Sequence, residues 1–235
     1  MTLFSLAEFI FVAIFLIFPP LINAPENEIL ALDFSKGYSI STYAVFLVSL
    51  FIFAERNYSE KKNNKKSVSN AKKSSLIEKT SVGTVCLGAI FIVSAVFQAF
   101  SLLENKGSFK SQTIIFPESF FYFASFFTGT FFAAFSEEVI YRFYLPDALK
   151  NNIKILSLGR LNCEKSKALN LLFELLSVCI FALSHRYLGL LSVFNAFFSG
   201  FILRFCMIKS KSVFVPFLIH SVYNFSVFLF ARFIS

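Results

Sequence analysis

The chain has 235 residues, of which 56% are hydrophobic and 15% are charged. Soluble domains carry about 25% charged residues, so this composition excludes a soluble enzyme, a disordered protein and a secreted disulfide scaffold. The 22 basic and 14 acidic residues give a net charge of +8, and they are concentrated in short intervals between long apolar stretches. We therefore predict an all-α, polytopic membrane protein.

A membrane-spanning helix needs about 20 apolar residues. The sequence predicts about seven spans, at roughly residues 3–24, 37–55, 81–103, 119–142, 168–187, 189–208 and 212–234. Pro19 and Pro20 are expected to kink or shorten the first span, because each proline removes a backbone donor. The first span has no basic residues before it, so we expect it to be retained rather than cleaved as a signal peptide near Ala24.

The charges of the connecting loops predict the orientation of the chain. Lysine and arginine dominate residues 56–80, residues 146–167 and the turn at 209–211, whereas residues 25–36 are net negative and residues 104–118 are neutral. The positive-inside rule therefore places the N-terminus and the three basic loops in the cytoplasm. The run at 56–80 could bind nucleic acid or anionic lipid, but it has no aromatic platform, and we predict a topology determinant and no nucleic-acid partner.

Ionisable groups inside apolar spans are costly and often functional. Glu137, Glu138 and Arg142 close the span that begins at residue 119. Glu138 and Arg142 are four residues apart and can pair on one helical face, whereas Glu137 is rotated by about 100° and stays outside that pair. An equally simple interpretation of this segment is that the span ends at Glu137 and the charges lie at the membrane interface.

Both histidines of the chain lie in predicted spans. His185 ends an apolar run, and His220 and Asn224 are four residues apart, so they share a helical face. Each could be structural, as a packed histidine or an interhelical hydrogen bond. A carboxylate cluster, a histidine and a His/Asn pair on three spans are nevertheless sufficient to build a proton-transfer site. The four cysteines contain no CxxC pair, so no thiolate zinc site or disulfide framework is indicated.

These residues, in this order, resemble the intramembrane endopeptidases of the CPBP or Abi family. That family includes the type II CAAX prenyl proteases and the bacterial bacteriocin-processing and self-immunity proteases. Its motifs EExxxR, FxxxH and HxxxN are matched by Glu137, Glu138 and Arg142, by Phe181 and His185, and by His220 and Asn224; Gly200 and Pro216 resemble the glycine and proline before the last motif. The resemblance covers about residues 119–235 and separates this protease-like core from N-terminal transmembrane helices at 1–118.

The chain departs from the family pattern in two places. The gap between the first two motifs is longer than expected, because of a polar insert around residues 150–167, and Phe143 stands where many members have glycine. Neither departure removes a residue of the three motifs. Both bear on which substrate the protein would accept.

The resemblance implies an endopeptidase that hydrolyses a peptide bond of a membrane-associated or lipidated protein or peptide. Glu137 and His185 would activate water, His220 and Asn224 would donate hydrogen bonds to the oxyanion, and Glu138 and Arg142 would orient the site. A metal-free mechanism is preferred; if zinc is bound, Glu137, His185 and His220 are its candidate ligands. We expect a multi-pass protein of the bacterial plasma membrane, in contact with membrane lipid.

Two other functions remain open at this point. Intramembrane Glu, Arg and His also build proton-coupled transporters, although the sequence shows no pair of glycine- or proline-broken spans. A non-catalytic membrane immunity or scaffold protein would tolerate the loss of a motif residue, and none is missing. One difficulty concerns depth: a helix that begins at residue 168 would place His185 ~26 Å from the level of Glu137. Either this span begins after Glu174, which we prefer because a glutamate is poorly placed in lipid, or the helix that carries Glu137 is broken or shifted.

Overall fold

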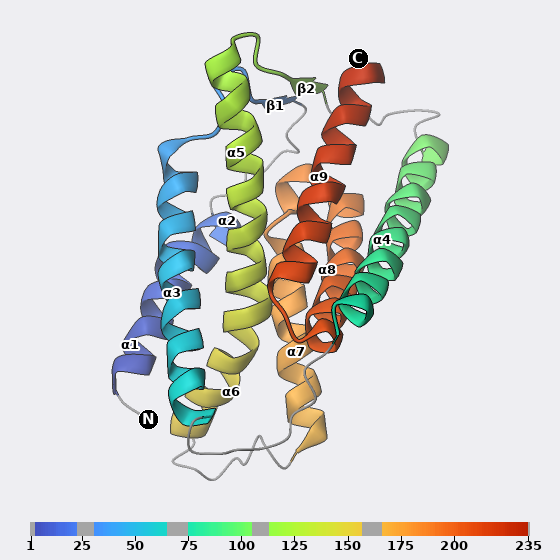
Figure 1. Ribbon diagram of the computed structural model, residues 1–235. Helices are drawn as coiled ribbons and strands as arrows, with labels where there is room; N and C mark the ends of the chain where they lie inside the picture. The colour runs from blue at the N-terminus through green and yellow to red at the C-terminus, as the bar shows by residue number, and fades with distance from the viewer. Residues whose placement is uncertain (1–2, 23–30, 65–74, 105–112, 157–165, 235) are drawn as a thin grey trace. The chain divides into compact units, whose positions relative to one another are not determined.

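The computed structural model describes residues 3–22, 31–64, 75–104, 113–156 and 166–234. Apart from one two-stranded sheet, the regular structure of these residues is helical. The helices are α1 (Leu3–Val12), η1 (Ala13–Ile17), α2 (Phe18–Ile22), α3 (Ile40–Asn64), α4 (Leu76–Glu104), α5 (Phe120–Glu137), η2 (Glu138–Tyr144), α6 (Leu145–Leu156), α7 (Lys167–Leu183), η3 (Arg186–Leu188), α8 (Leu190–Ser210) and α9 (Phe214–Ile234). The strands are β1 (Ala31–Asp33) and β2 (Thr113–Ile115). Figure 1 shows these elements along the chain.

The chain divides into two compact units whose segments alternate along the sequence. Unit 1 comprises Met1–Leu32, Ile90–Thr113 and Tyr141–Ile202, and unit 2 comprises Asp33–Ala89, Ile114–Ile140 and Leu203–Ser235. The positions of the two units relative to one another are not determined. The boundaries pass through α4, η2 and α8, so each unit contains part of these helices.

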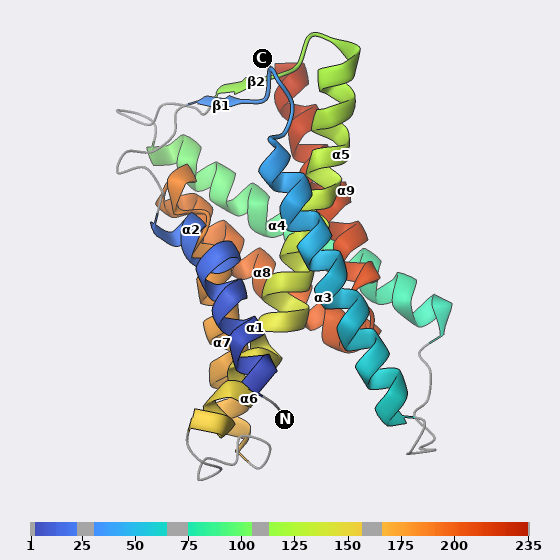
Figure 2. The ribbon, with the colours of Figure 1, turned by 90° about the vertical axis from the view of Figure 1, so that its left-hand side faces the viewer.

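In unit 2, α5 packs against α3 on one side and α9 on the other (Figures 1 and 2). Phe132 of α5 stacks on Phe46 of α3, with their ring centroids 4.0 Å apart. On the other side, Phe127 of α5 stacks on Phe225 of α9 at 4.4 Å. Interdigitated aromatic rings therefore hold α5 as the central helix of this unit.

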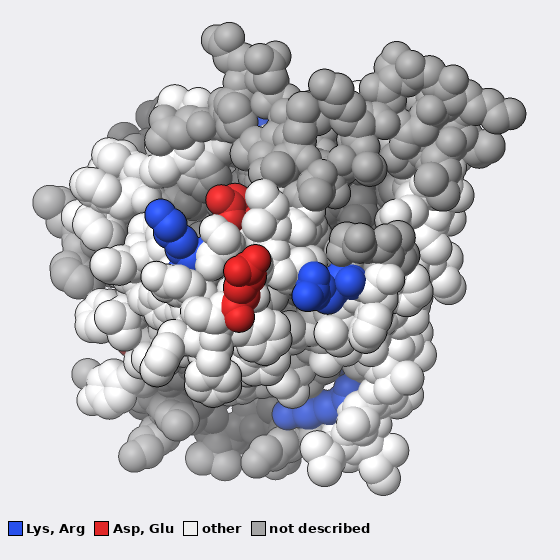
Figure 3. Space-filling view, turned by 90° about the horizontal axis from the view of Figure 1, so that it is seen from above, with Lys and Arg blue, Asp and Glu red and all other residues white. Residues whose placement is uncertain are grey.

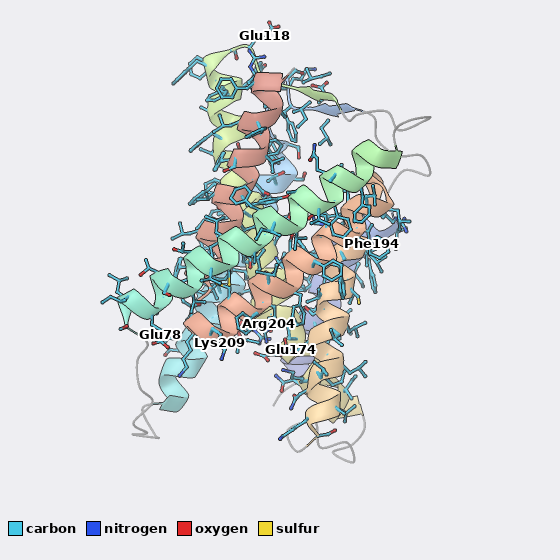
Figure 4. All side chains as sticks on the ribbon, turned by 90° about the vertical axis from the view of Figure 1, so that its right-hand side faces the viewer. Glu78, Glu118, Glu174, Phe194, Arg204 and Lys209 are labelled. Carbon is cyan, nitrogen blue, oxygen red and sulfur yellow. The ribbon has the colours of Figure 1, made fainter. Side chains whose placement is uncertain are left out.

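In unit 1, α6 packs against α7 and α1 packs against α6. Lys150 of α6 contacts Glu174 of α7, with Nζ 2.8 Å from Oε1. Glu174, labelled in Figure 4, lies within α7, which begins at Lys167 after the capping residue Ser166. The helix therefore begins seven residues before Glu174, and the start of the membrane span after Glu174 stays a prediction. The lysine partner explains how the helix includes this residue, because a paired carboxylate is tolerated within a packed helix.

The first predicted span is helical but changes pitch before its two prolines. The π-helical segment η1 separates α1 from α2, and Pro19 and Pro20 lie at the start of α2. A proline lacks its N–H, and its ring crowds the carbonyl four residues earlier, which for Pro19 is the carbonyl of Phe15 in η1. A wider helical turn relieves that crowding. The suggested cleavage site at Ala24 lies outside the described residues.

Four helices of the described chain are long and apolar enough to cross a membrane. Their apolar parts are Ile40–Tyr58, Leu76–Phe100, Leu190–Ser210 and Phe214–Phe233, and Leu6–Ile22 is a shorter apolar helix. The protein is therefore an all-α integral membrane protein, but seven spans are not confirmed. The two remaining candidates are shorter, since α7 has 17 residues and α5 has 18 and ends at a glutamate.

Parts of two predicted polar loops are helical. Helix α3 continues to Asn64, which is nine residues beyond the predicted end of the span at 55, and α6 occupies the start of the insert at 150–167. Residues 65–74 and 157–165 lie outside the described chain. The helical extension of α3 carries several charged residues, so its last turns are outside the apolar part of that helix.

The described surface is rich in apolar side chains. Phe51, Phe121 and Phe233 are 67%, 81% and 86% exposed, respectively. Seen from above, few described lysine, arginine, aspartate or glutamate side chains stand among many uncharged ones (Figure 3). Because such a surface is unfavourable in water, it fits contact with lipid.

Candidate active site

The glutamate pair lies where α5 changes into the π-helical segment η2. Glu137 is the last residue of α5 and Glu138 is the first of η2. The Glu138 side chain is 0% exposed and Arg142 is 2% exposed, so neither is a solvated charge at a helix end. Both side chains are therefore enclosed by the protein, whatever their depth in the membrane. Single π-helical turns frequently mark functional sites.

In unit 2, His220 of α9 lies against both glutamates. Its Nδ1 is 2.8 Å from Oε1 of Glu138, which is hydrogen-bond distance, and its Nε2 is 3.6 Å from Oε2 of Glu137. The imidazole is only 7% exposed. A buried histidine between two carboxylates is a costly arrangement that packing alone does not require.

The Glu137 carboxylate differs from that of Glu138 in its access to solvent. Its side chain is 30% exposed, whereas that of Glu138 is fully buried. Its Oε2 atom is buried and accepts no hydrogen bond from the described residues. The 3.6 Å gap between this oxygen and Nε2 of His220 exceeds a direct hydrogen bond.

Asn224 lies one helical turn after His220 on α9 and is partly buried. Helices α5 and α9 run antiparallel, since Phe135 contacts Phe217 and Phe126 contacts Phe228. By this register, Asn224 lies level with Thr130, about two turns before Glu137 on α5. Asn224 therefore shares a helical face with His220, but its backbone is about two turns of α5 away from Glu137. Its role at the site stays a prediction.

In unit 1, His185 follows the end of α7 and precedes the short helix η3. Its Nδ1 is 3.0 Å from the carbonyl oxygen of Phe181 and 3.2 Å from Oγ of Ser184. A carbonyl oxygen only accepts hydrogen bonds, so this contact favours the tautomer with the proton on Nδ1. In the neutral ring, Nε2 then carries the lone pair that a general base needs.

Phe181 connects the first two motifs in unit 1. The Arg142 guanidinium carbon lies 3.9 Å from the centroid of the Phe181 ring, a cation–π contact. A Cβ atom added to Gly200 would lie 3.0 Å from Cδ1 of the same ring. The arginine, the phenylalanine and the glycine that the sequence analysis quoted separately therefore pack together. Helical spacing alone could not predict this contact, because it joins three different helices.

The π-helical turn also has a partner on α7. The Ser177 hydroxyl donates a hydrogen bond to the carbonyl oxygen of Tyr141. Because the regular α-helical ladder is interrupted in η2, carbonyl groups there need other donors. The sequence contained no signal for the role of Ser177, which lies in an otherwise apolar stretch of α7.

The structure thus distributes the candidate residues over both units. Unit 2 brings Glu137, Glu138 and His220 into contact, with Asn224 on the same helix as His220. Unit 1 contains Arg142 and His185. Among the described residues, no three His, Cys, Asp or Glu side chains are arranged as a metal site.

Comparison with known families supports the assignment suggested by the motifs. Residues 117–226 match the family model described as Type II CAAX prenyl endopeptidase Rce1-like. This segment of the chain is Rce1-like. The matched residues contain all three motifs, from Glu137 to Asn224. No curated protein and no solved structure matches the chain. The Rce1-like family supports an intramembrane endopeptidase of the CAAX protease type.

Proposed function

We propose that this Rce1-like protein is an intramembrane endopeptidase that hydrolyses a peptide bond in a membrane-associated or lipidated protein or peptide by means of an activated water molecule. The observation that carries this proposal is the position of His220 between Glu137 and Glu138. Glu137, which is partly exposed, has His220 as its neighbour, and the buried carboxylate of Glu138 holds the His220 ring.

Glu137 is the proposed general base. It takes a proton from water while the water oxygen forms a bond to the carbonyl carbon of the substrate. Partial exposure of the side chain supports this role, because the water has to reach the carboxylate. The family resemblance also implies a base role for His185, whose Nδ1 contact favours a lone pair on Nε2.

His220 and Asn224 are the proposed donors to the oxyanion that forms on the substrate carbonyl oxygen. With Nδ1–H donated to Glu138, His220 also donates through Nε2 when its ring carries both protons. Glu138 is therefore proposed as a positioning residue that orients the imidazole. When the intermediate collapses, the carbonyl reforms, the C–N bond breaks, and Glu137 returns its proton to the leaving nitrogen.

The first test is cleavage of a defined substrate by the purified protein in lipid vesicles. A peptide with a prenylated cysteine followed by three residues is the appropriate probe for a CAAX-type protease. We expect cleavage by the wild-type chain and its loss in Glu137→Gln, which keeps the shape of the side chain but removes the base. Cleavage by Glu137→Gln at more than a few per cent of the wild-type rate would contradict this role.

The same preparation distinguishes the proposed route from a zinc-dependent one. Elemental analysis of active protein is expected to show no stoichiometric zinc, and chelators are expected to leave the rate unchanged. One zinc per chain, lost together with activity on chelation and absent from His220→Ala, would contradict the metal-free mechanism.

A further inference from the structure

Tyr38 reaches the region of the candidate site from outside the matched family segment. It lies in the connection between β1 and α3, which runs beside the first half of α5 in unit 2 (Figures 1 and 2). Gly37, just before it, has φ +71°, and a Cβ atom there would lie 2.6 Å from Oγ of Ser125. The backbone thus approaches α5 at a position where only glycine fits.

The Tyr38 ring occupies a gap on α5 that a glycine creates. A Cβ atom on Gly129 would lie 2.4 Å from two carbon atoms of this ring. Phe34 and Phe126 cover the ring, with centroid distances of 5.2 and 6.2 Å. Aromatic packing and the absence of a side chain at Gly129 therefore determine where the phenol points.

The hydroxyl of Tyr38 contacts the same face of α5 as Glu137. Its oxygen is 3.5 Å from Oγ1 of Thr130, which donates its own proton to the carbonyl oxygen of Phe126 at 2.8 Å. Thr130 and Glu137 are seven residues apart, so they share one helical face. By the antiparallel register, Asn224 of α9 lies level with Thr130. The phenol is therefore about two helical turns from Glu137 along α5.

Among the described residues, the acceptor for the O–H proton of Tyr38 is Oγ1 of Thr130, and the separation of 3.5 Å is long for a hydrogen bond between two hydroxyl groups. Burial raises the pKa of this phenol, the hydrogen bond with Thr130 lowers it, and the charge of Glu137 raises it further. The net direction is upward, so the hydroxyl remains a donor at every pH at which the protein would work. A donor that is held only by a long hydrogen bond gains free energy when a nearer acceptor, such as an oxygen of a bound ligand, replaces its partner.

We propose that Tyr38 is a substrate-binding residue, whose hydroxyl donates a hydrogen bond to an oxygen of the bound peptide about two helical turns from the base Glu137. The acceptor is a backbone carbonyl or the C-terminal carboxylate of the peptide. This inference rests on the proposed function. It adds a residue from the N-terminal part of the chain, whereas the motifs all lie between residues 137 and 224.

The test compares Tyr38→Phe with Tyr43→Phe. Tyr43 also contacts α5 through its hydroxyl, at 2.9 Å from Oγ of Ser125, but that hydroxyl already has partners in the protein. Each change removes one hydroxyl and keeps the ring. For Tyr38→Phe we expect KM to rise by about 3- to 10-fold with kcat nearly unchanged, as for one uncharged hydrogen bond to substrate. For Tyr43→Phe we expect an unchanged KM and a lower midpoint of thermal unfolding.

A binding measurement separates this inference from the proposed function. A fluorescent prenylated peptide is titrated into vesicles that contain Glu137→Gln with and without Tyr38→Phe, and the double variant is expected to bind about 3- to 10-fold more weakly. A loss greater than 10-fold that disappears with an amide-ended peptide would identify the carboxylate as the acceptor.

Three outcomes overturn the inference. Cleavage by the wild-type chain with equal KM and equal peptide affinity in Tyr38→Phe overturns the role of Tyr38 and leaves the proposed function intact. An equal rise in KM for both tyrosine variants would assign the effect to altered packing on α5. Absence of both cleavage and peptide binding in the wild-type chain overturns the proposed function and this inference together.

Discussion

At the scale of single residues, the two histidines differ in what their Nδ1 atoms face. The Nδ1 atom of His185 faces the carbonyl oxygen of Phe181, whereas Nδ1 of His220 faces the carboxylate of Glu138. Both oxygens accept a hydrogen bond from Nδ1–H and so orient the ring. We predict a base role for His185 and a donor role for His220.

Asn224 provides the sharpest test of the donor role on α9. We expect Asn224→Ala to lower kcat by about 10²–10³-fold with little change in KM, which is the usual loss for one oxyanion donor. Asn224→Asp should retain part of the activity, because a protonated carboxyl group can still donate. The measurement is steady-state cleavage of the prenylated peptide in vesicles.

The control for this prediction is Ser226→Ala on the same helix. The Ser226 hydroxyl donates to the carbonyl oxygen of Val222 in its own helix, so its removal should leave kcat and KM near their wild-type values. If Asn224→Ala turns over as fast as this control, Asn224 is not an oxyanion donor.

At the scale of secondary-structure elements, α5 depends on close approach by its neighbours. Gly129 admits the Tyr38 ring, and Thr130 directly after it is almost fully buried. A central helix that carries small residues at contact points can bring neighbouring groups close to its axis. The α-helical part ends at Glu137, and the chain continues directly into the π-helical segment η2. The residues that pack against Tyr38 and the candidate catalytic glutamates therefore lie on one continuous helical segment.

Gly129→Ala should therefore destabilise the protein. The added Cβ would lie 2.4 Å from the Tyr38 ring, and overpacking of this kind costs about 1–3 kcal/mol. Thermal unfolding in detergent or vesicles, followed by the loss of helical circular dichroism, measures the effect. The matched change Gly88→Ala on α4 meets no atom within 4 Å and should stabilise the helix by up to about 1 kcal/mol. Equal midpoints for the two variants would show that the Gly129 contact is unimportant.

At the scale of the whole molecule, the loop charges predict which end of each helix faces the cytoplasm. Within unit 2, Glu118 and Lys209 lie at opposite ends (Figure 4). The predicted topology requires this separation, because it assigns residues 104–118 to the outside and the turn at 209–211 to the cytoplasm. The direction itself remains a prediction.

Cysteine labelling in intact cells tests that direction. In a chain whose four cysteines are replaced by alanine, Glu118→Cys should react with a membrane-impermeant maleimide added from outside. Lys211→Cys should react only after the membrane is permeabilised. The reverse pattern would invert the topology, and labelling of both positions from one side would contradict a membrane-spanning α5–α9 pair.

The sequence predicted membrane insertion and the helical class correctly, because both follow from local composition. Long apolar segments with few charges are unfavourable in water and partition into lipid. In lipid the backbone has to satisfy its own hydrogen bonds, which an α-helix does within one segment. The order of the three motifs similarly identified the Rce1-like segment. The seven predicted spans are not confirmed, since four of the described helices are long and apolar enough to cross a membrane. Helix α7 is short, and the first predicted span contains a π-helical turn that hydropathy does not predict.

Only the tertiary structure decided which groups meet. Helical spacing could propose partners for Glu138 only on its own helix, whereas the structure brings His220 to Glu138 across 82 residues of sequence. Likewise, only the structure supplies Lys150 as the partner of Glu174, and only the structure places the Tyr38 ring against Gly129. Local sequence determines where a chain enters lipid and where it becomes helical, because those free energies are sums over neighbouring residues. Contacts between helices that are distant in sequence depend on how their side chains fit and pair once the helices pack. A sum over neighbouring residues does not include these interactions.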